Sequence, residues 1–109
     1  MVTAIQRAPV LSEIREIVRG VCRAHAVARA DVFGSVARGE AEPGSDVDVL
    51  VEFLPEARAG LLELGALRED LAERLGRPVD VVSRRAIERS ANPFRRRAIL
   101  GSAANVYVR

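Results

Sequence analysis

Two aspartates separated by one residue, Asp46 and Asp48, are the first candidates for chemistry in this 109-residue chain. They begin a stretch, residues 46–53, that alternates like a strand, and side chains two residues apart on a strand point to the same face. Their carboxylates would therefore stand side by side, where both resist ionisation together unless a cation neutralises them. Oxygen ligands of this kind suit Mg²⁺, with Mn²⁺ as the alternative.

A third aspartate, Asp80, lies inside the apolar run of residues 79–83, which is predicted to be a short strand. A charge buried in the middle of an apolar strand is costly unless it has a partner. A metal site shared with the aspartate pair would provide that partner. An ion pair with Arg77 or Arg84 is the alternative.

Gly34 and Ser35 lie where a predicted strand runs into a short helical turn. Glycine permits close approach of the backbone, the helix start exposes amide groups, and the serine adds a hydroxyl, so the pair could cradle a phosphate. Arg38 is a candidate cation for the phosphates, with a solvated surface position as its alternative. Gly-Ser by itself is more often an ordinary turn, and Asp46 by itself could be an Asx-turn residue, but that use would not explain Asp48.

A phosphate cradle together with three carboxylates predicts metal-assisted transfer from a nucleoside triphosphate. In a scheme with two ions, one ion lowers the pKa of the attacking hydroxyl. The other holds the triphosphate and its leaving pyrophosphate.

The elements that must position these residues follow from periodicity, caps and turns. The pattern predicts helices at residues 10–26, 60–75 and 93–103, a short helical turn at 34–39, and strands at 29–33, 46–53, 79–83 and 105–109. Asn92 is the expected N-cap of the last helix. This order predicts an α/β (α+β) fold, a small mixed sheet with helices packed against it, as one domain over residues 1–109.

Apolar residues are expected to form the buried faces of two of these elements. One face of the strand at 46–53 carries Val47, Val49, Val51 and Phe53, with Asp46, Asp48, Leu50 and Glu52 on the other face. The helix at 60–75 is expected to bury the stripe Leu61, Leu64, Leu67, Leu71 and Leu75.

Composition excludes several classes of function. The chain has 17 basic residues, all arginine, against 15 acidic residues, and its net charge of +2 is too small to predict a nucleic acid as direct ligand. Aromatic content of 4% gives few rings for stacking bases. Arg95, Arg96 and Arg97 would fan over about 200° of a helix, because each residue turns it by about 100°. We interpret them mainly as a solvated face, with contact to an acidic partner surface as the minor alternative.

The single cysteine, Cys22, and the single histidine, His25, exclude an internal disulfide and a zinc site of soft ligands. His25 is expected to be structural or exposed, and Tyr107 to be an edge-strand residue, although a free edge could also dock a partner. Nothing in the sequence approaches a membrane span or a signal peptide, so a cytoplasmic location without membrane contact is expected.

Residues 33–39, FGSVARG, followed by residues 45–51, SDVDVLV, resemble the signature of the DNA polymerase β-like nucleotidyltransferase superfamily. More narrowly, they resemble the minimal nucleotidyltransferases (MNT, or MntA-like antitoxins), and residues 75–82, LGRPVDVV, look like that family's third-carboxylate segment. One departure is Val36, where many members carry a basic residue directly after Gly-Ser. That departure leaves Arg38 as the nearby cation for the phosphates.

The resemblance implies a role for each matching residue. Asp46 and Asp48 correspond to the metal-binding pair, and Asp80 to the third carboxylate, a metal ligand that can also act as base toward the acceptor hydroxyl. Gly34 and Ser35 correspond to the triphosphate-binding pair. Members of the family typically use ATP and Mg²⁺, and many silence a neighbouring HEPN-domain RNase toxin by transferring AMP to one of its tyrosines.

The sequence therefore predicts an Mg²⁺-dependent nucleotidyltransferase that moves AMP from ATP to a hydroxyl of a HEPN-type toxin, as the antitoxin of a toxin–antitoxin pair. Two alternatives remain open at this point. The chain could neutralise its partner by binding alone, with the carboxylates as remnants. It could also modify a small molecule, as aminoglycoside nucleotidyltransferases do.

Overall fold

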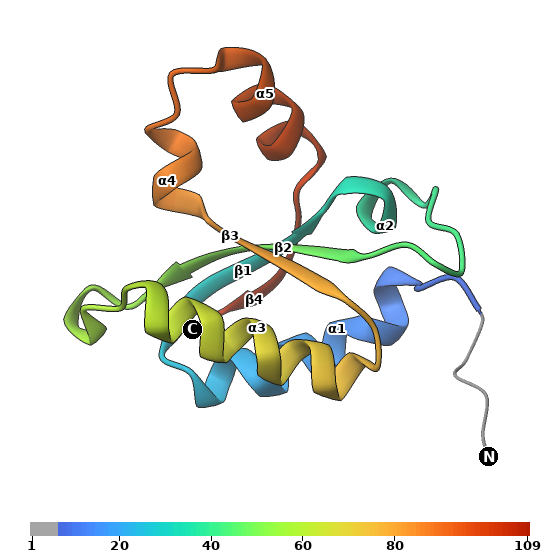
Figure 1. Cartoon of the computed structure of the whole chain (residues 1–109), viewed down its shortest axis with the longest axis horizontal. Helices are drawn as coiled ribbons and strands as arrows, with labels where there is room; N and C mark the ends of the chain where they lie inside the picture. Colours follow the sequence, from blue (N-terminus) through green and yellow to red (C-terminus); the bar gives the residue numbers. More distant parts are fainter. Residues whose placement is uncertain (1–6) are drawn as a thin grey trace.

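The computed structural model describes residues 7–109. Its elements in chain order are α1 (Leu11–Ala24), β1 (Val27–Phe33), α2 (Gly34–Arg38), β2 (Val47–Phe53), η1 (Pro55–Ala57), α3 (Leu61–Leu75), β3 (Val79–Ser83), α4 (Arg84–Glu88), α5 (Pro93–Ser102) and β4 (Ala104–Val108). The strands form a four-stranded sheet in the order β3-β2-β1-β4 (Figure 1). β1 is antiparallel to β2 and β4, whereas β2 and β3 are parallel. The predicted mixed sheet with packed helices is confirmed.

Helix boundaries follow the capping residues. The side chain of Asn92 accepts hydrogen bonds from the backbone N–H groups of Phe94 and Arg95, at 3.0 and 3.1 Å, which confirms it as the N-cap of α5. α3 begins where the Glu63 carboxylate accepts a hydrogen bond from the Gly60 N–H at 2.6 Å. It ends at Gly76, whose φ of 69° suits glycine.

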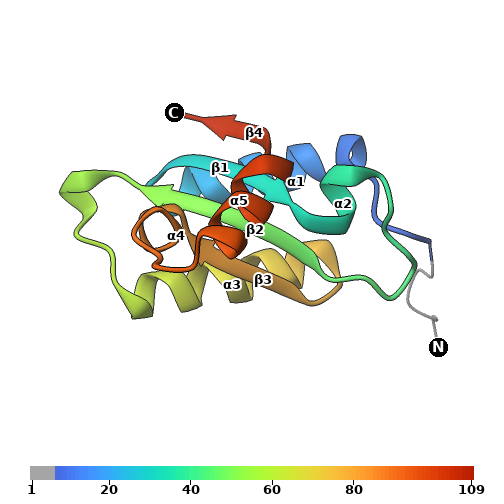
Figure 2. The same ribbon diagram turned by 90° about the horizontal axis from the view of Figure 1, so that it is seen from above.

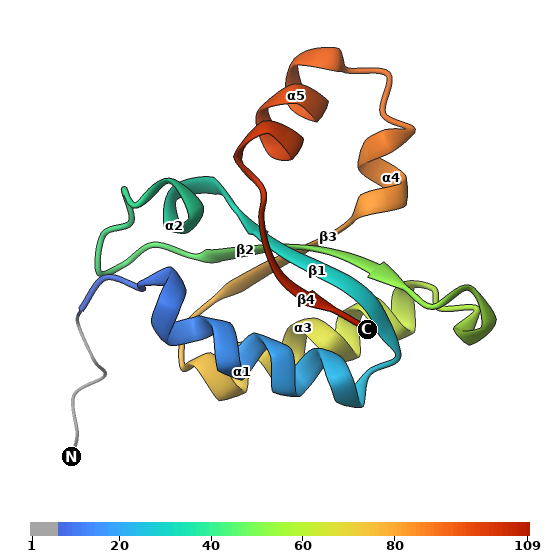
Figure 3. The ribbon, with the colours of Figure 1, turned by 180° about the vertical axis from the view of Figure 1, so that it is seen from behind.

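Helices cover both faces of the sheet. α1 and α3 lie side by side on one face (Figures 1 and 3), where Val47, Val49 and Val51 join the larger hydrophobic core. α4 and α5 arch over the other face, where Leu50 and Phe33 pack with Ile87 and Ile99 (Figure 2). The central strand β2 is therefore buried on both sides, and the predicted division of its residues between two faces is confirmed.

The expected leucine stripe of α3 is wrong at one end. Leu67 and Leu71 are fully buried, and Leu64 and Leu75 pack against the core, but Leu61 is 87% exposed. Helical spacing places Leu61 on the correct face, yet none of residues 7–109 covers it at the first turn of α3. The short helix α4 and the turn η1 were also not predicted, because elements of three to five residues show little periodicity.

β4 is an edge strand, as expected. Tyr107 is buried within it, and its hydroxyl accepts a hydrogen bond from Arg109 Nε at 3.1 Å. Among the helices of the described residues, none combines the length and apolarity needed to cross a membrane.

Candidate active site

The strand register brings Asp48 and Asp80 together. Asp48, in the second position of β2, pairs with Asp80 of β3 on one side and with Phe33 of β1 on the other. Paired residues of neighbouring strands point to the same face, so both carboxylates lie on the face that α4 and α5 partly cover. Asp46 immediately precedes β2 and lies two residues before Asp48. All three predicted carboxylates thus lie at the N-terminal ends of the two parallel strands.

The three acids share one electrostatic field. The pKa of Asp48 is raised above its ordinary value of 3.8, first by partial burial and then by the negative charges of Asp80 and Asp46. The positive charge of Arg38 acts in the opposite direction and lowers the pKa. A nearby cation would therefore favour the ionised form of Asp48.

Gly34 lies in close contact with the Asp48 side chain. Its φ of 75° lies in the left-handed region, and a Cβ at this position would lie only 2.4 Å from Asp48 Oδ2. Any other residue would be strained and would also displace the carboxylate. The corner between β1 and α2 is therefore shaped to leave room for the central acid.

The amide of Gly34 is not free. It donates a hydrogen bond to Ser102 Oγ at 3.3 Å, and the Ser102 hydroxyl in turn lies within hydrogen-bond distance of the Ala98 and Ile99 carbonyls. Of the amide groups that the sequence predicts to point outward at this helix start, the one of Gly34 is already bound by the end of α5. The half-buried Ser35 makes no side-chain hydrogen bond to any residue from 7 to 109.

Arg38 and Val36 explain the departure from the family signature. Val36 is 3% exposed and belongs to the larger core, so the position directly after Gly-Ser faces the interior here. Arg38 is exposed and donates from Nε to Glu40 Oε1 at 2.9 Å. Arg38 is thus a solvated surface residue, which was the alternative to a phosphate-binding role in the sequence analysis. Its positive charge is nevertheless close enough to lower the pKa of Asp48.

The buried aspartate of the sheet is Asp31, which the sequence analysis did not single out. Asp31 of β1 is 1% exposed and accepts hydrogen bonds from the guanidinium of Arg84 and, at 2.8 Å, from Asn105 Nδ2. The Nε of Arg29 lies 3.4 Å from Asp31 Oδ1, the oxygen that also accepts from Asn105. The signal was present, because Asp31 also interrupts an apolar strand.

Asp80 itself is exposed, so the expectation that it is buried in an apolar strand is wrong. β3 lies at the edge of the sheet, where the Asp80 side chain remains open to solvent. The alternative pairing with arginine is wrong as well. Arg77 donates to backbone carbonyls of Pro43 and Arg7, and Arg84 binds Asp31 and Glu88.

The carboxylate oxygens of Asp46, Asp48 and Asp80 are of the ligand type that hard divalent cations prefer. Within residues 7–109, no three acidic, histidine or cysteine side chains converge tightly enough to form a ready metal cage. Mg²⁺ at nucleotide sites is usually bound by one or two carboxylates together with substrate phosphates and waters, rather than by such a cage. Burial, followed by the negative charges of Asp80 and Asp46, raises the pKa of Asp48, and a bound cation would offset these effects.

Cys22 and His25 have structural positions. Cys22 is fully buried, and burial raises the pKa of its thiol to about 12, so the thiol stays protonated and unreactive. His25 Nε2 lies 2.9 Å from Asp70 Oδ2 and joins the end of α1 to α3. Of the two expectations for His25, the structural one is confirmed.

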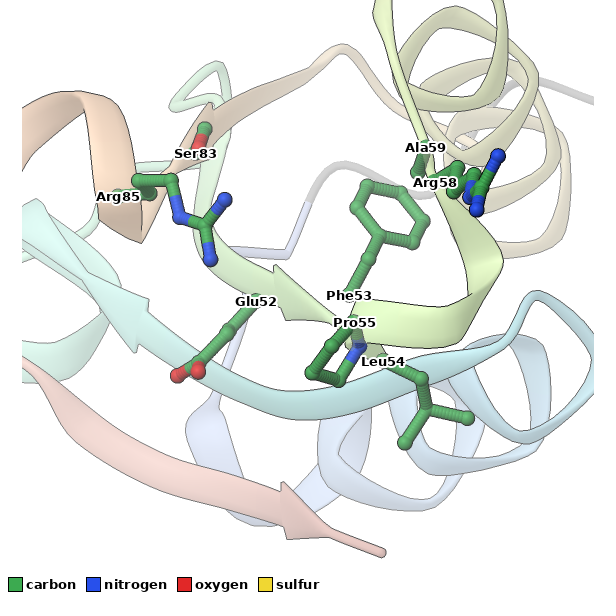
Figure 4. A pocket seen from close by; sticks show the side chains of 8 residues that line it. All are labelled: Glu52, Phe53, Leu54, Pro55, Arg58, Ala59, Ser83 and Arg85. Atoms are coloured by element: carbon green, nitrogen blue, oxygen red, sulfur yellow. The ribbon is translucent and has the colours of Figure 1, made fainter.

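The cavity in Figure 4 lies at the other ends of the parallel strands. It has a volume of about 130 Å³ and is bordered by Glu52, Phe53 and Ser83 from the ends of β2 and β3, with Arg85 and Arg58 on either side of the Phe53 ring. A larger cavity of about 370 Å³ lies between the segment before α1 and the side of α2 formed by Val36, Ala37 and Gly39. Neither cavity is lined by the three aspartates.

The chain is similar to known proteins over most of its length. The model of a family described as "Nucleotidyltransferase domain" matches residues 14–104. Putative protein adenylyltransferase MJ0435 of Methanocaldococcus jannaschii is 38% identical over 96 residues, which cover 88% of this chain and 97% of that protein. Protein adenylyltransferase MntA of Thermococcus cleftensis is 46% identical over 57 residues, 52% of this chain and 56% of that protein.

Solved structures show the same fold. One described as a putative minimal nucleotidyltransferase is 41% identical, with a TM-score of 0.67 over 85% of this chain and 89% of that one. Another, a tri-AMPylated Shewanella oneidensis HEPN toxin in complex with MNT antitoxin, matches with a TM-score of 0.64 at 17% identity. That match covers 92% of this chain and 74% of the other, and at this identity it shows the fold alone.

Proposed function

The chain belongs to the nucleotidyltransferase domain family, and on that premise we propose that it transfers AMP from ATP to a hydroxyl of a partner protein. The observation that carries the proposal is the placement of Asp48. This half-buried acid lies beside Asp80, two residues after Asp46, and directly against the one residue, Gly34, that leaves it room. Carboxylates crowded beside a strand-to-helix corner suit a nucleoside triphosphate and its cation.

Each residue has a distinct part in the proposed reaction. The acceptor oxygen attacks the α-phosphorus of ATP, the bond to the β-phosphate oxygen breaks, and pyrophosphate leaves. The hydroxyl of Ser35 binds a phosphate oxygen beside Gly34, and Arg38 offsets negative charge at the edge of the site. Asp80, the exposed carboxylate, receives the acceptor's proton. Most of the acceleration would come from positioning and charge neutralisation.

Asp46, Asp48 and Asp80 would hold the divalent cations, two Mg²⁺ ions or Mn²⁺ in their place. When bound, such ions lower the pKa of the attacking hydroxyl and neutralise the charge of the leaving pyrophosphate. Because the proposed reaction consumes ATP, we place the protein in the cytoplasm.

We propose that the acceptor is a tyrosine of a HEPN-type RNase toxin and that the chain is its antitoxin. Support comes from the two relatives named as protein adenylyltransferases and from the fold shared with an MNT antitoxin whose toxin is AMPylated. The acidic corner is open to solvent at Asp46 and Asp80, which suits an acceptor presented on another protein.

The test combines the protein, the product of the gene beside its own, ATP labelled at the α-phosphate, and Mg²⁺. We expect the label to become covalently attached to the neighbouring protein, to be lost when a chelator removes Mg²⁺, and to be lost with Asp46→Asn. Glu69→Gln, the same change on the exposed face of α3, is the matched control and should label normally. Neutralisation of the partner by Asp46→Asn without label would instead support inhibition by binding, and label on a soluble small molecule would overturn the protein acceptor.

A further inference from the structure

Positive charge is concentrated in one part of the chain. Residues 84–102, from the start of α4 to the end of α5, are here named the α4–α5 arm. The arm contains six arginines and a single acidic residue, Glu88. The remaining residues contain eleven arginines and fourteen acidic residues. The nearly neutral chain is thus divided into a cationic arm and an acidic body, which the net charge of +2 conceals.

Most arginines of the arm are open to solvent. Two are used internally, because Arg84 binds Asp31 and Glu88, and Arg96 donates to the Ser90 carbonyl at 2.6 Å. The other four are exposed and form no ion pair with any residue that the structure describes: Arg85, Arg89, Arg95 and Arg97. Phe94, which is 78% exposed, lies between Arg97 and Arg95 around the axis of α5, because each residue turns the helix by about 100°, whereas Arg96 between them in sequence points to the other side.

The arm is attached to the candidate active site. α4 and α5 lie over one face of the sheet (Figures 1 and 2). Ile87 and Ile99 of these helices pack on Phe33 and Leu50, on the face that also carries Asp48 and Asp80. Ser102, the last residue of α5, accepts the hydrogen bond from Gly34. The C-terminal end of α5 therefore lies next to the corner where the reaction is proposed to occur, whereas α4 begins at the other ends of the parallel strands, so a molecule that rests along α5 reaches the corner from one side.

We propose that the α4–α5 arm is the docking surface for the acceptor protein, and that the docked face of that protein is acidic around an apolar position that receives Phe94. This inference rests on the proposed function and extends it to the partner's chemistry. Arginine and phenylalanine are enriched at the centres of protein interfaces, where arginine pairs with carboxylates. Opposite charges on the two faces would also steer the encounter.

A nucleic acid fits the same arm less well. A phosphate backbone that continues from the arm onto the sheet face of Asp48 and Asp80 would meet like charges there. The arm offers one exposed ring, Phe94, where single-stranded binders use several. A protein can instead place its acidic residues on the arginines and a neutral hydroxyl at the carboxylates.

The experiment compares two double charge reversals in the full chain. Arg95→Glu with Arg97→Glu changes the arm. Arg68→Glu with Arg74→Glu changes two exposed arginines of α3, on the opposite face of the sheet, and serves as the matched control. Affinity for the protein encoded beside this gene is measured by calorimetry without ATP, and the KM for that protein is measured where transfer occurs. Thermal unfolding verifies that each variant is folded.

The arm variant is expected to bind the neighbouring protein at least about tenfold more weakly, with a raised KM and a kcat near that of the wild type. The control variant should bind like the wild type, and added salt should weaken the wild-type complex. Equal binding of the neighbouring protein by both variants would overturn the proposal. So would an arm variant that binds this protein like the wild type but has lost affinity for a mixed-sequence RNA oligonucleotide. Because the affinity is measured without catalysis, wild-type binding without AMP transfer would refute the proposed function and still test the arm.

Discussion

Replacing Gly34 with alanine separates the two reasons for a glycine at this corner. A non-glycine residue at a φ of 75° is strained by about 1–2 kcal/mol, partly offset by reduced freedom of the unfolded chain. The new Cβ would also lie 2.4 Å from Asp48 Oδ2, where ordinary contacts begin at 3.4 Å. The carboxylate must therefore move by about 1 Å, and a displacement of that size typically costs about 100-fold in rate.

Gly39→Ala is the matched control. Gly39 has nearly the same φ, 72°, but nothing lies within 4 Å of the Cβ that alanine would add. Both variants are expected to lose about 1 kcal/mol, or roughly 5 °C in Tm. Only Gly34→Ala should lose about 100-fold in the kcat of AMP transfer, measured well below both melting temperatures. Equal activities for the two variants would refute the assignment of Asp48 to the reacting site.

Three further changes test the electrostatics and the packing. Asp48→Asn should raise the Tm at neutral pH, because burial and neighbouring acids raise the pKa of this carboxyl and make its ionised form destabilising. The gain in Tm should vanish as the pH falls below 3.8, where the carboxyl is protonated in both the folded and the unfolded chain, and a gain that does not depend on pH would contradict the argument. Asp31→Ala should lower the unfolding free energy by about 3–5 kcal/mol in denaturant titrations, since it removes the buried carboxylate that binds Arg84 and leaves this 12%-exposed guanidinium with only the exposed Glu88 at 3.8 Å. Glu16→Gln in an exposed pair should change the unfolding free energy by less than about 0.5 kcal/mol. Gly65→Ala should add about 0.5–1 kcal/mol, because the site lies inside a helix with open space around it, and a loss would reveal hidden crowding.

Local signals in the sequence were sufficient for most of the fold. The strand at residues 79–83 was predicted with its observed bounds, because proline precedes it and its apolar residues are continuous. The helix that begins at Pro93 was predicted from its Asn92 cap. The alternation of β2 predicted that Asp48 lies on the face of the strand opposite to the core valines. On that face its side chain lies beside that of Asp80, its partner in β3.

What the sequence could not give depends on contacts between distant segments. Ser102 and Gly34 are 68 residues apart, and nothing in either local sequence indicates their hydrogen bond. A charge in an apolar strand needs a partner, and the sequence analysis applied this rule to Asp80. Which aspartate is buried depends on the order of the strands in the sheet, and the sequence does not reveal that order. β1 lies inside the sheet and β3 at its edge, so the rule holds for Asp31 instead.

The most direct test of the central claim follows the two ends of the triphosphate in parallel reactions. ATP labelled at the α-phosphate and ATP labelled at the γ-phosphate are each incubated with the protein, its neighbouring gene product and Mg²⁺. The account predicts that the α-label appears on the neighbouring protein and the γ-label leaves in pyrophosphate. Transfer of the γ-label to protein, or α-labelling that persists when Asp46, Asp48 and Asp80 are all changed to asparagine, would contradict it.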